Sequence, residues 1–190
     1  ILEHMAFKGT DTIGTKNYKA EQKAMAAEDA AFAALKAERL KGEFADAAKL
    51  QALEAAFTKA KDDARAFVVS NQFGEIVEQH GGVGLNASTW VDETQYHYSF
   101  PSNRLELWAY LEGARMSGPV LREFYTEKDG PVTEERRMRT DNSPFGRLME
   151  QFQNLAFMAS GYHHSTIGYM ADLNNISRQD CADFYRRNYV

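Results

Sequence analysis

The sequence predicts an α+β protein. Helix-forming and strand-forming segments both occur, but they do not alternate in the regular βαβ order that builds a parallel sheet. Between residues 20 and 66, eighteen of forty-seven residues are alanine, with Lys, Glu and Gln between them, which favours long helices. Residues 85–100 instead alternate β-branched or aromatic side chains with polar ones, which is typical of a strand.

Length and composition indicate a folded chain and exclude some classes of partner. The chain has 190 residues, of which 44% are hydrophobic and 12% aromatic, enough for a substantial core. A net charge of −5 predicts no nucleic-acid partner, and no apolar run is long enough to predict a membrane span. The single cysteine, Cys181, has no partner for a disulfide or a thiolate metal site, so a buried, unreactive thiol is expected.

The first residues are predicted to be the end of a helix. Residues 1–7 form an apolar, helix-compatible run with no N-terminal cap, and residues 9–15 then interrupt the periodicity as a loop. The chain is therefore expected to be a piece of a longer protein. Any targeting segment would lie upstream, so the compartment, periplasmic or cytoplasmic, stays open.

Residues 17–72 are predicted to form a helical hairpin. Larger apolar residues recur at helical intervals on both sides of Gly42, which is the expected turn, and the alanines would let the two backbones approach closely. The hairpin could be a partner-binding arm or an elongated insertion that packs on its own domain. The second interpretation is favoured because Ala-rich helices carry no recognition chemistry by themselves.

The next elements are predicted from turn residues and helical spacing. Glycines at 81–84 mark a turn before the strand at 85–100, which Pro101 ends. Apolar residues return to helical spacing over 105–116, and residues 121–125 begin a further helical stretch.

Two helix starts are predicted further along the chain. Pro131 is expected at the first position of a new helix, where a missing backbone N–H costs nothing. Ser177 and Asp180 approximate a capping box for a last helix that runs through Arg187.

Glu3 and His4 are the first candidates for chemistry. If a histidine preceded Ile1, the chain would begin H-x-x-E-H, an inverted zinc-hydrolase motif. That histidine and His4 would share one face of a helix and could hold one zinc ion. Glu3 would lie beside the ion, as the base that takes a proton from the attacking water and passes it to the leaving amine.

Four segments in order match motifs of a known family. Residues 1–10 read ILEHMAFKGT, and residues 82–89 with Asp92, Thr94 and Tyr96 resemble the strand motif G-x-x-N-A-x-T-x-x-D-x-T-x-Y. Residues 127–139 resemble the helix that carries a further ligand, and residues 167–173 resemble the segment that follows the site. In these segments the chain resembles the pitrilysin/insulinase family of zinc metallopeptidases, which includes the mitochondrial processing peptidases. The resemblance covers nearly the whole chain except the Ala-rich hairpin, which would then be an insertion within the domain.

The resemblance implies a fold, a cofactor and partners. It implies that residues 1–190 are part of one peptidase half without its N-terminal strands, built from a mixed, largely antiparallel sheet packed against helices. It implies Zn2+ as the cofactor, a peptide as the substrate, and a second peptidase half or a paired subunit as the partner. Asn86, Ala87, Ser88 and Thr89 would bind an extended peptide as an added strand at the sheet edge.

The resemblance also implies a glutamate as a further metal ligand, either Glu135 or Glu134. The family places this ligand two helical turns after another glutamate, and that spacing from Glu127 gives Glu134. Counting back from the arginine-rich segment 136–139 gives Glu135, which is favoured because a one-residue insertion near 130–131 would disturb the upstream count more easily than the helix itself. Glu127 would accept the free N–H of a ligand histidine.

Two functions follow from these residues. The first is a zinc endopeptidase that hydrolyses extended peptides through a metal-activated water, with Glu3 as the base and with His4, Glu135 and a histidine before Ile1 as ligands. The isolated chain would then be inactive or nearly so. The alternative is a non-catalytic structural or partner-binding homologue of the same fold; the Glu3-His4 pair favours the enzyme. The histidines at 80, 97, 163 and 164 are expected to be ordinary loop, surface or core residues.

Overall fold

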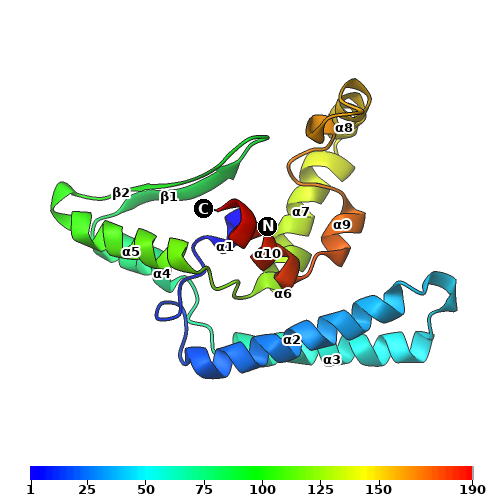
Figure 1. Cartoon of the computed structure of the whole chain (residues 1–190), viewed down its shortest axis with the longest axis horizontal. Helices are drawn as coiled ribbons and strands as arrows, with labels where there is room; N and C mark the ends of the chain where they lie inside the picture. The colour runs from blue at the N-terminus through cyan, green and yellow to red at the C-terminus, as the bar shows by residue number, and fades with distance from the viewer. Residues whose placement is uncertain (190) are drawn as a thin grey trace.

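The structure, a computed structural model, describes residues 1–189. A long helical hairpin, a β-hairpin and a helical segment project in different directions from a centre that contains α1 (Leu2–Met5) and α10 (Arg178–Asn188) (Figure 1). Helices and an antiparallel sheet occur together without βαβ alternation, so the predicted α+β class is confirmed.

The Ala-rich segment forms the predicted hairpin, from α2 (Tyr18–Arg39) and α3 (Ala47–Arg65). Each helix begins at a side-chain cap: Asn17 accepts a hydrogen bond from a backbone N–H of α2, and Asp46 accepts one from α3. Gly42 lies in the connection with a φ of 58°, a conformation that favours glycine. That the hairpin is an insertion within 17–72 stays a prediction.

The middle of the hairpin belongs to the core of the molecule. The ring of Tyr125 lies 4.5 Å from the ring of Phe32 in α2 and 5.3 Å from the ring of Phe57 in α3, measured between centroids. At the far end of the hairpin, Leu40 and Phe44 are exposed. The hairpin therefore packs on its own domain along much of its length and projects at its turn, as Figure 1 shows.

The β-hairpin corrects one prediction. The segment 85–100 is not one strand: β1 (Val83–Thr89) pairs antiparallel with β2 (Thr94–Ser99), and the Trp90 N–H donates to the Glu93 carbonyl in the turn between them. Trp90 and the residue after it have side chains typical of strands, so local composition conceals the turn.

Two helices pack against the β-hairpin. They are α4 (Gln72–Gln79), which the sequence did not reveal because it is short and follows the long hairpin directly, and α5 (Leu105–Ser117), which was predicted. Their buried residues Phe73, Val77 and Leu111 belong to a second core cluster, against which Tyr98 of β2 and Phe100 pack. This cluster fixes the β-hairpin relative to the rest of the chain.

One continuous helical segment runs from Phe124 to Asp141. It consists of α6 (Phe124–Glu127), a π-helical turn (Lys128–Val132), α7 (Thr133–Arg136) and a second π-helical turn (Arg137–Asp141). Pro131 lies inside the first π-helical turn, so the prediction that it starts a new helix is wrong. A proline cannot donate the regular i→i−4 hydrogen bond, and a wider turn keeps the helix going around it.

The C-terminal region adds α8 (Pro144–Ala156), α9 (Met170–Asn175) and α10. The predicted capping box of Ser177 with Asp180 is present at the start of α10 and is confirmed. The thiol of Cys181 is buried, and burial raises its pKa to about 11, as expected for an unreactive thiol. Within residues 1–189, no helix is long and apolar enough to cross a bilayer.

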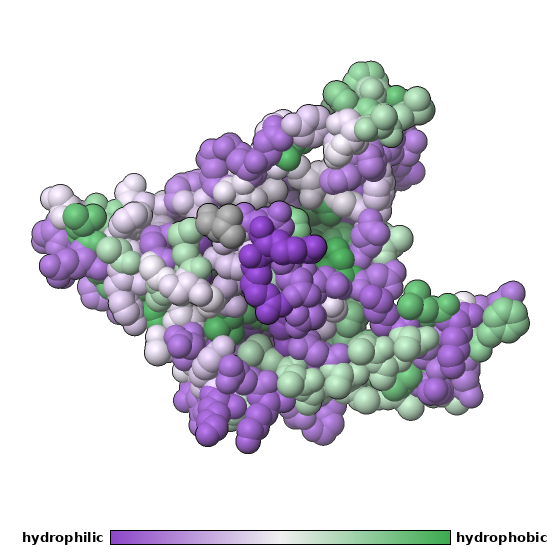
Figure 2. All heavy atoms as spheres, in the orientation of Figure 1, coloured by the Kyte–Doolittle hydropathy of each residue, from purple (hydrophilic) through white to green (hydrophobic). Residues whose placement is uncertain are grey.

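Helix α8 was not predicted, although its pattern is amphipathic. Large apolar side chains recur along it at helical spacing and are exposed, so hydrophobic atoms gather where α8 lies (Figure 2). These residues are Phe145, Leu148, Met149, Phe152 and Leu155.

Candidate metal centre

The predicted site residues come from elements that are far apart in the sequence. Glu3 and His4 lie on α1, Glu135 lies on α7, and Thr89 ends β1. All four line one cavity of about 180 Å³. The fold thus gathers the candidate base, two candidate ligands and the end of the candidate substrate strand around one small space.

His4 is held between two carboxylates. Its Nδ1 lies 3.0 Å from Oε1 of Glu127, and its Nε2 lies 3.4 Å from Oε2 of Glu135. The hydrogen bond with Glu127 raises the pKa of His4, although burial opposes this. When Nδ1–H donates to Glu127, the neutral ring leaves the lone pair of Nε2 directed toward Glu135, as in histidines that bind metals.

The register of the helix brings Glu135, and not Glu134, next to His4. One ordinary turn and one π-helical turn together span about eight residues, so Glu135 lies on the same face as Glu127. Glu134 points away: it is exposed and pairs with Arg137, at 2.6 Å. The count from Glu127 gave Glu134 and the count from residues 136–139 gave Glu135. The π-helical turn around Pro131 holds one residue more than an ordinary turn, which accounts for this difference.

Glu3 faces the end of β1. The hydroxyl of Thr89 donates to Oε2 of Glu3 at 3.1 Å. Ala87 and Ser88 line the same cavity, whereas Asn86 does not line it and accepts a hydrogen bond from the N–H of Ala87. In the part of the chain that the structure describes, β1 pairs only with β2, so its other edge carries no strand.

Sequence reasoning missed two cations next to these carboxylates. Lys8 Nζ lies 2.7 Å from Oε2 of Glu127, and Arg139 Nη1 lies 2.8 Å from Oε1 of Glu135. The hydrogen bonds from His4 and Lys8 lower the pKa of Glu127 to about 2. The position of Arg139, one helical turn after Glu135, could have indicated its contact; Lys8 offered no such local signal.

The chemistry and spacing of the donors suit a zinc ion. Zinc takes imidazole nitrogen and carboxylate oxygen at about 2.0–2.2 Å, so two tetrahedral ligands lie about 3.4 Å apart. The separation of His4 Nε2 from Glu135 Oε2 has this value, 3.4 Å. Over residues 1–189, no cluster of three or more His, Cys, Asp or Glu side chains is placed to hold a metal ion. These residues therefore present two converging candidate ligands, His4 and Glu135.

Three of the other histidines contact backbone carbonyls, and two of them, His163 and His164, also line a second cavity together with Glu3 and Thr89. Nδ1 of His80, His163 and His164 is within hydrogen-bond distance of backbone carbonyl oxygens. That these histidines are ordinary loop, surface or core residues stays a prediction.

The chain is similar to a protein named as a zinc protease and to a solved protease structure. No protein-family model matches the chain. The chain is 38% identical over 122 residues to "Zinc protease PqqE" of Helicobacter pylori; the match covers 63% of this chain and 27% of that protein. A crystal structure of a protease from Helicobacter pylori aligns with a TM-score of 0.58 and 38% identity, over 63% of this chain and 29% of that one. The chain thus spans between a quarter and a third of these relatives, and its resemblance to the pitrilysin/insulinase-like zinc peptidases is confirmed.

Proposed function

We propose that this chain forms the metal-binding part of a zinc-dependent endopeptidase that hydrolyses extended peptides. The observation that carries the proposal is the convergence of His4 Nε2 and Glu135 Oε2 at 3.4 Å, in the cavity that Glu3 also lines. The relative named as a zinc protease supports the same activity class. Because the chain spans about a quarter of that relative, the complete site is proposed to need a second peptidase half or a paired subunit.

His4 and Glu135 would hold the zinc ion together with a histidine that precedes Ile1. When bound, zinc would polarise the substrate carbonyl and lower the pKa of a water molecule, which makes that water a nucleophile at neutral pH. Glu127, by accepting the Nδ1–H of His4, would keep the imidazole in the tautomer and orientation that leave Nε2 free for the metal.

Glu3 is proposed to be the general base. Its carboxylate reaches the cavity, and the hydroxyl of Thr89 holds one of its oxygens at 3.1 Å. The other oxygen would accept the proton of the attacking water and later deliver it to the leaving amine. Asn86 to Thr89 would bind the peptide backbone along the open edge of β1.

Zinc content tests the choice of ligands. In a protein that carries the natural residues before Ile1, we expect about one zinc ion per chain and peptide cleavage that a chelator abolishes. Glu135→Gln should remove a charged ligand and lower the zinc content strongly, whereas the matched variant Glu134→Gln should not, because Glu134 is exposed and pairs with Arg137. Metal analysis of the three purified proteins makes the comparison.

Two outcomes would contradict this assignment. Cleavage that resists the chelator would exclude a metal-dependent mechanism. If the residue before Ile1 is not histidine and no zinc binds, the chain is instead a non-catalytic structural or partner-binding homologue of the same fold.

The π-helical turn allows a second test of the register. Deleting Gly130 and replacing Pro131 by Ala should convert the turn into ordinary helix, with Glu135 then seven residues after Glu127 and still on the same face. We expect zinc binding to survive the deletion. Within the deleted background, Glu135→Gln should abolish zinc binding and Glu134→Gln should leave it unchanged. Dependence on Glu134 in the deleted protein would show that the π-helical turn does not set the register.

A further inference from the structure

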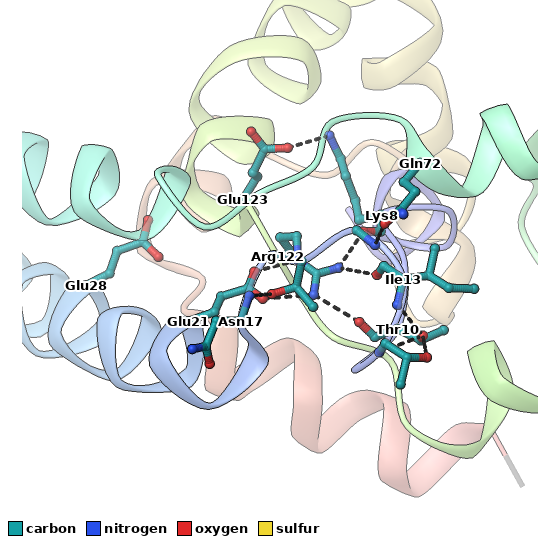
Figure 3. A network of polar contacts seen from close by, with 12 residues as sticks. Lys8, Thr10, Ile13, Asn17, Glu21, Glu28, Gln72, Arg122 and Glu123 are labelled. Atoms are coloured by element: carbon teal, nitrogen blue, oxygen red, sulfur yellow. Dashed lines mark hydrogen bonds and ion pairs between the residues drawn. The ribbon is translucent and has the colours of Figure 1, made fainter.

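A buried arginine binds several backbone carbonyls of the loop that follows α1, residues 8–13. The guanidinium of Arg122, which is 1% exposed, donates to both carboxylate oxygens of Glu21 in α2, at 2.5 and 2.9 Å. It also donates to the backbone carbonyls of Lys8 at 2.7 Å, Thr10 at 2.9 Å and Ile13 at 3.1 Å. Figure 3 shows the loop curled around this side chain. We name these contacts the Arg122 clamp.

The loop can close on Arg122 only because of two glycines. Gly9 and Gly14 have φ values of 102° and 86°, and a Cβ at either position would lie 2.8 or 2.7 Å from Nη1 of Arg122. Side chains at these positions would therefore strain the backbone and push against the guanidinium. The clamp fixes the backbone of Lys8, and Glu21 anchors the clamp to the base of the helical hairpin.

The side chain of Lys8 reaches from the clamp to the candidate metal centre. Its ammonium lies 2.7 Å from Oε2 of Glu127 and 3.5 Å from Oε2 of Glu123, and Figure 3 shows the contact with Glu123. The other oxygen of Glu127, Oε1, is 3.0 Å from Nδ1 of His4. Each oxygen of Glu127 thus has its own partner, and the two contacts together fix the orientation of the carboxylate.

We propose that Lys8 is a positioning residue for His4: it holds Glu127 in the orientation that aligns the imidazole, and the Arg122 clamp holds Lys8. The inference rests on the proposed function, since it assigns His4 to a metal ion. Without the ammonium, Glu127 would keep one partner and could rotate, and His4 would lose the fixed direction of Nε2. The helical hairpin then contributes to the metal centre through Glu21, although none of its residues lines the cavity.

Metal binding by three variants tests the inference. Lys8→Met removes the charge, Lys8→Arg keeps it, and Lys59→Met is the matched control, because Lys59 is an exposed lysine of α3 that pairs with Asp63. In the complete protein, zinc affinity is measured by competition with a chelator, and the ligand geometry by the visible spectrum of the Co2+-substituted form. Partners of metal ligands typically contribute 10–100-fold in metal affinity, so Lys8→Met should weaken zinc binding about tenfold and shift the Co2+ bands.

The controls separate this role from a general loss of structure. Lys8→Arg should restore most of the affinity and the spectrum, and Lys59→Met should match the unmodified protein. Equal affinity and an unchanged spectrum in Lys8→Met would overturn the inference, as would a loss that Lys8→Arg does not rescue. An unmodified protein that binds no zinc would instead overturn the proposed function, and this inference with it.

Discussion

Replacing Glu3 by Gln is expected to lower the kcat of peptide hydrolysis by about 10²–10⁴-fold, the usual contribution of a general base. The amide keeps the size of the side chain and can still accept the hydrogen bond from Thr89, but it cannot take up a proton at neutral pH. Because Glu3 is not a proposed ligand, the zinc content should stay near that of the unmodified protein. Steady-state kinetics with an extended peptide, together with metal analysis of the same sample, measure both quantities.

Thr89→Val gives the matched control for this experiment. It removes the hydroxyl that contacts Glu3 but leaves the carboxylate, so its effect on kcat should be much smaller than that of Glu3→Gln. Full activity in Glu3→Gln would show that another group acts as the base.

Replacing Arg122 by Met is expected to lower the free energy of unfolding by about 3–5 kcal/mol, as for other buried ion pairs that lose one partner. Glu21 has 0% exposure and would keep a buried charge without its cation, and three backbone carbonyls would lose their donor. Equilibrium unfolding in urea measures the change.

Two further variants test whether the loss of stability comes from the buried pair Arg122–Glu21. The double variant Arg122→Met with Glu21→Met removes both charges and should recover a large part of the loss. Arg39→Met removes one partner of the exposed pair Arg39–Glu54 and should cost less than about 1 kcal/mol. A loss of similar size in Arg122→Met and Arg39→Met would contradict the role of burial.

The sequence predicted elements whose signals are local. The hairpin around Gly42 and the capping box at Ser177 each depend on residues a few positions apart, and both are present. The turn between β1 and β2 was missed because strand-forming side chains occupy it, and Pro131 was placed at a helix start because local rules do not foresee a π-helical turn.

In the candidate site, too, the residues with a local sequence signal could be predicted and the others could not. Glu3 and His4 could be named because they are adjacent in a motif, whereas the choice between Glu134 and Glu135 depended on one residue of helical register. That register depends on the π-helical turn around Pro131, which local sequence rules do not foresee. Arg122 was not singled out at all, because its partner Glu21 is 101 positions away and its other acceptors are backbone carbonyls.

The uneven burial of the helical hairpin divides it into a dispensable and an indispensable part. The end with Leu40 and Phe44 contacts little of the body, so matched trimming of both helices from that end would shorten the arm and leave the rest intact. Excising the whole arm would also take away Phe32 and Glu21, which would leave a hole beside Tyr125 and an orphaned guanidinium. The length of the hairpin at its turn can therefore vary, whereas the part of it that contains Glu21 and Phe32 cannot.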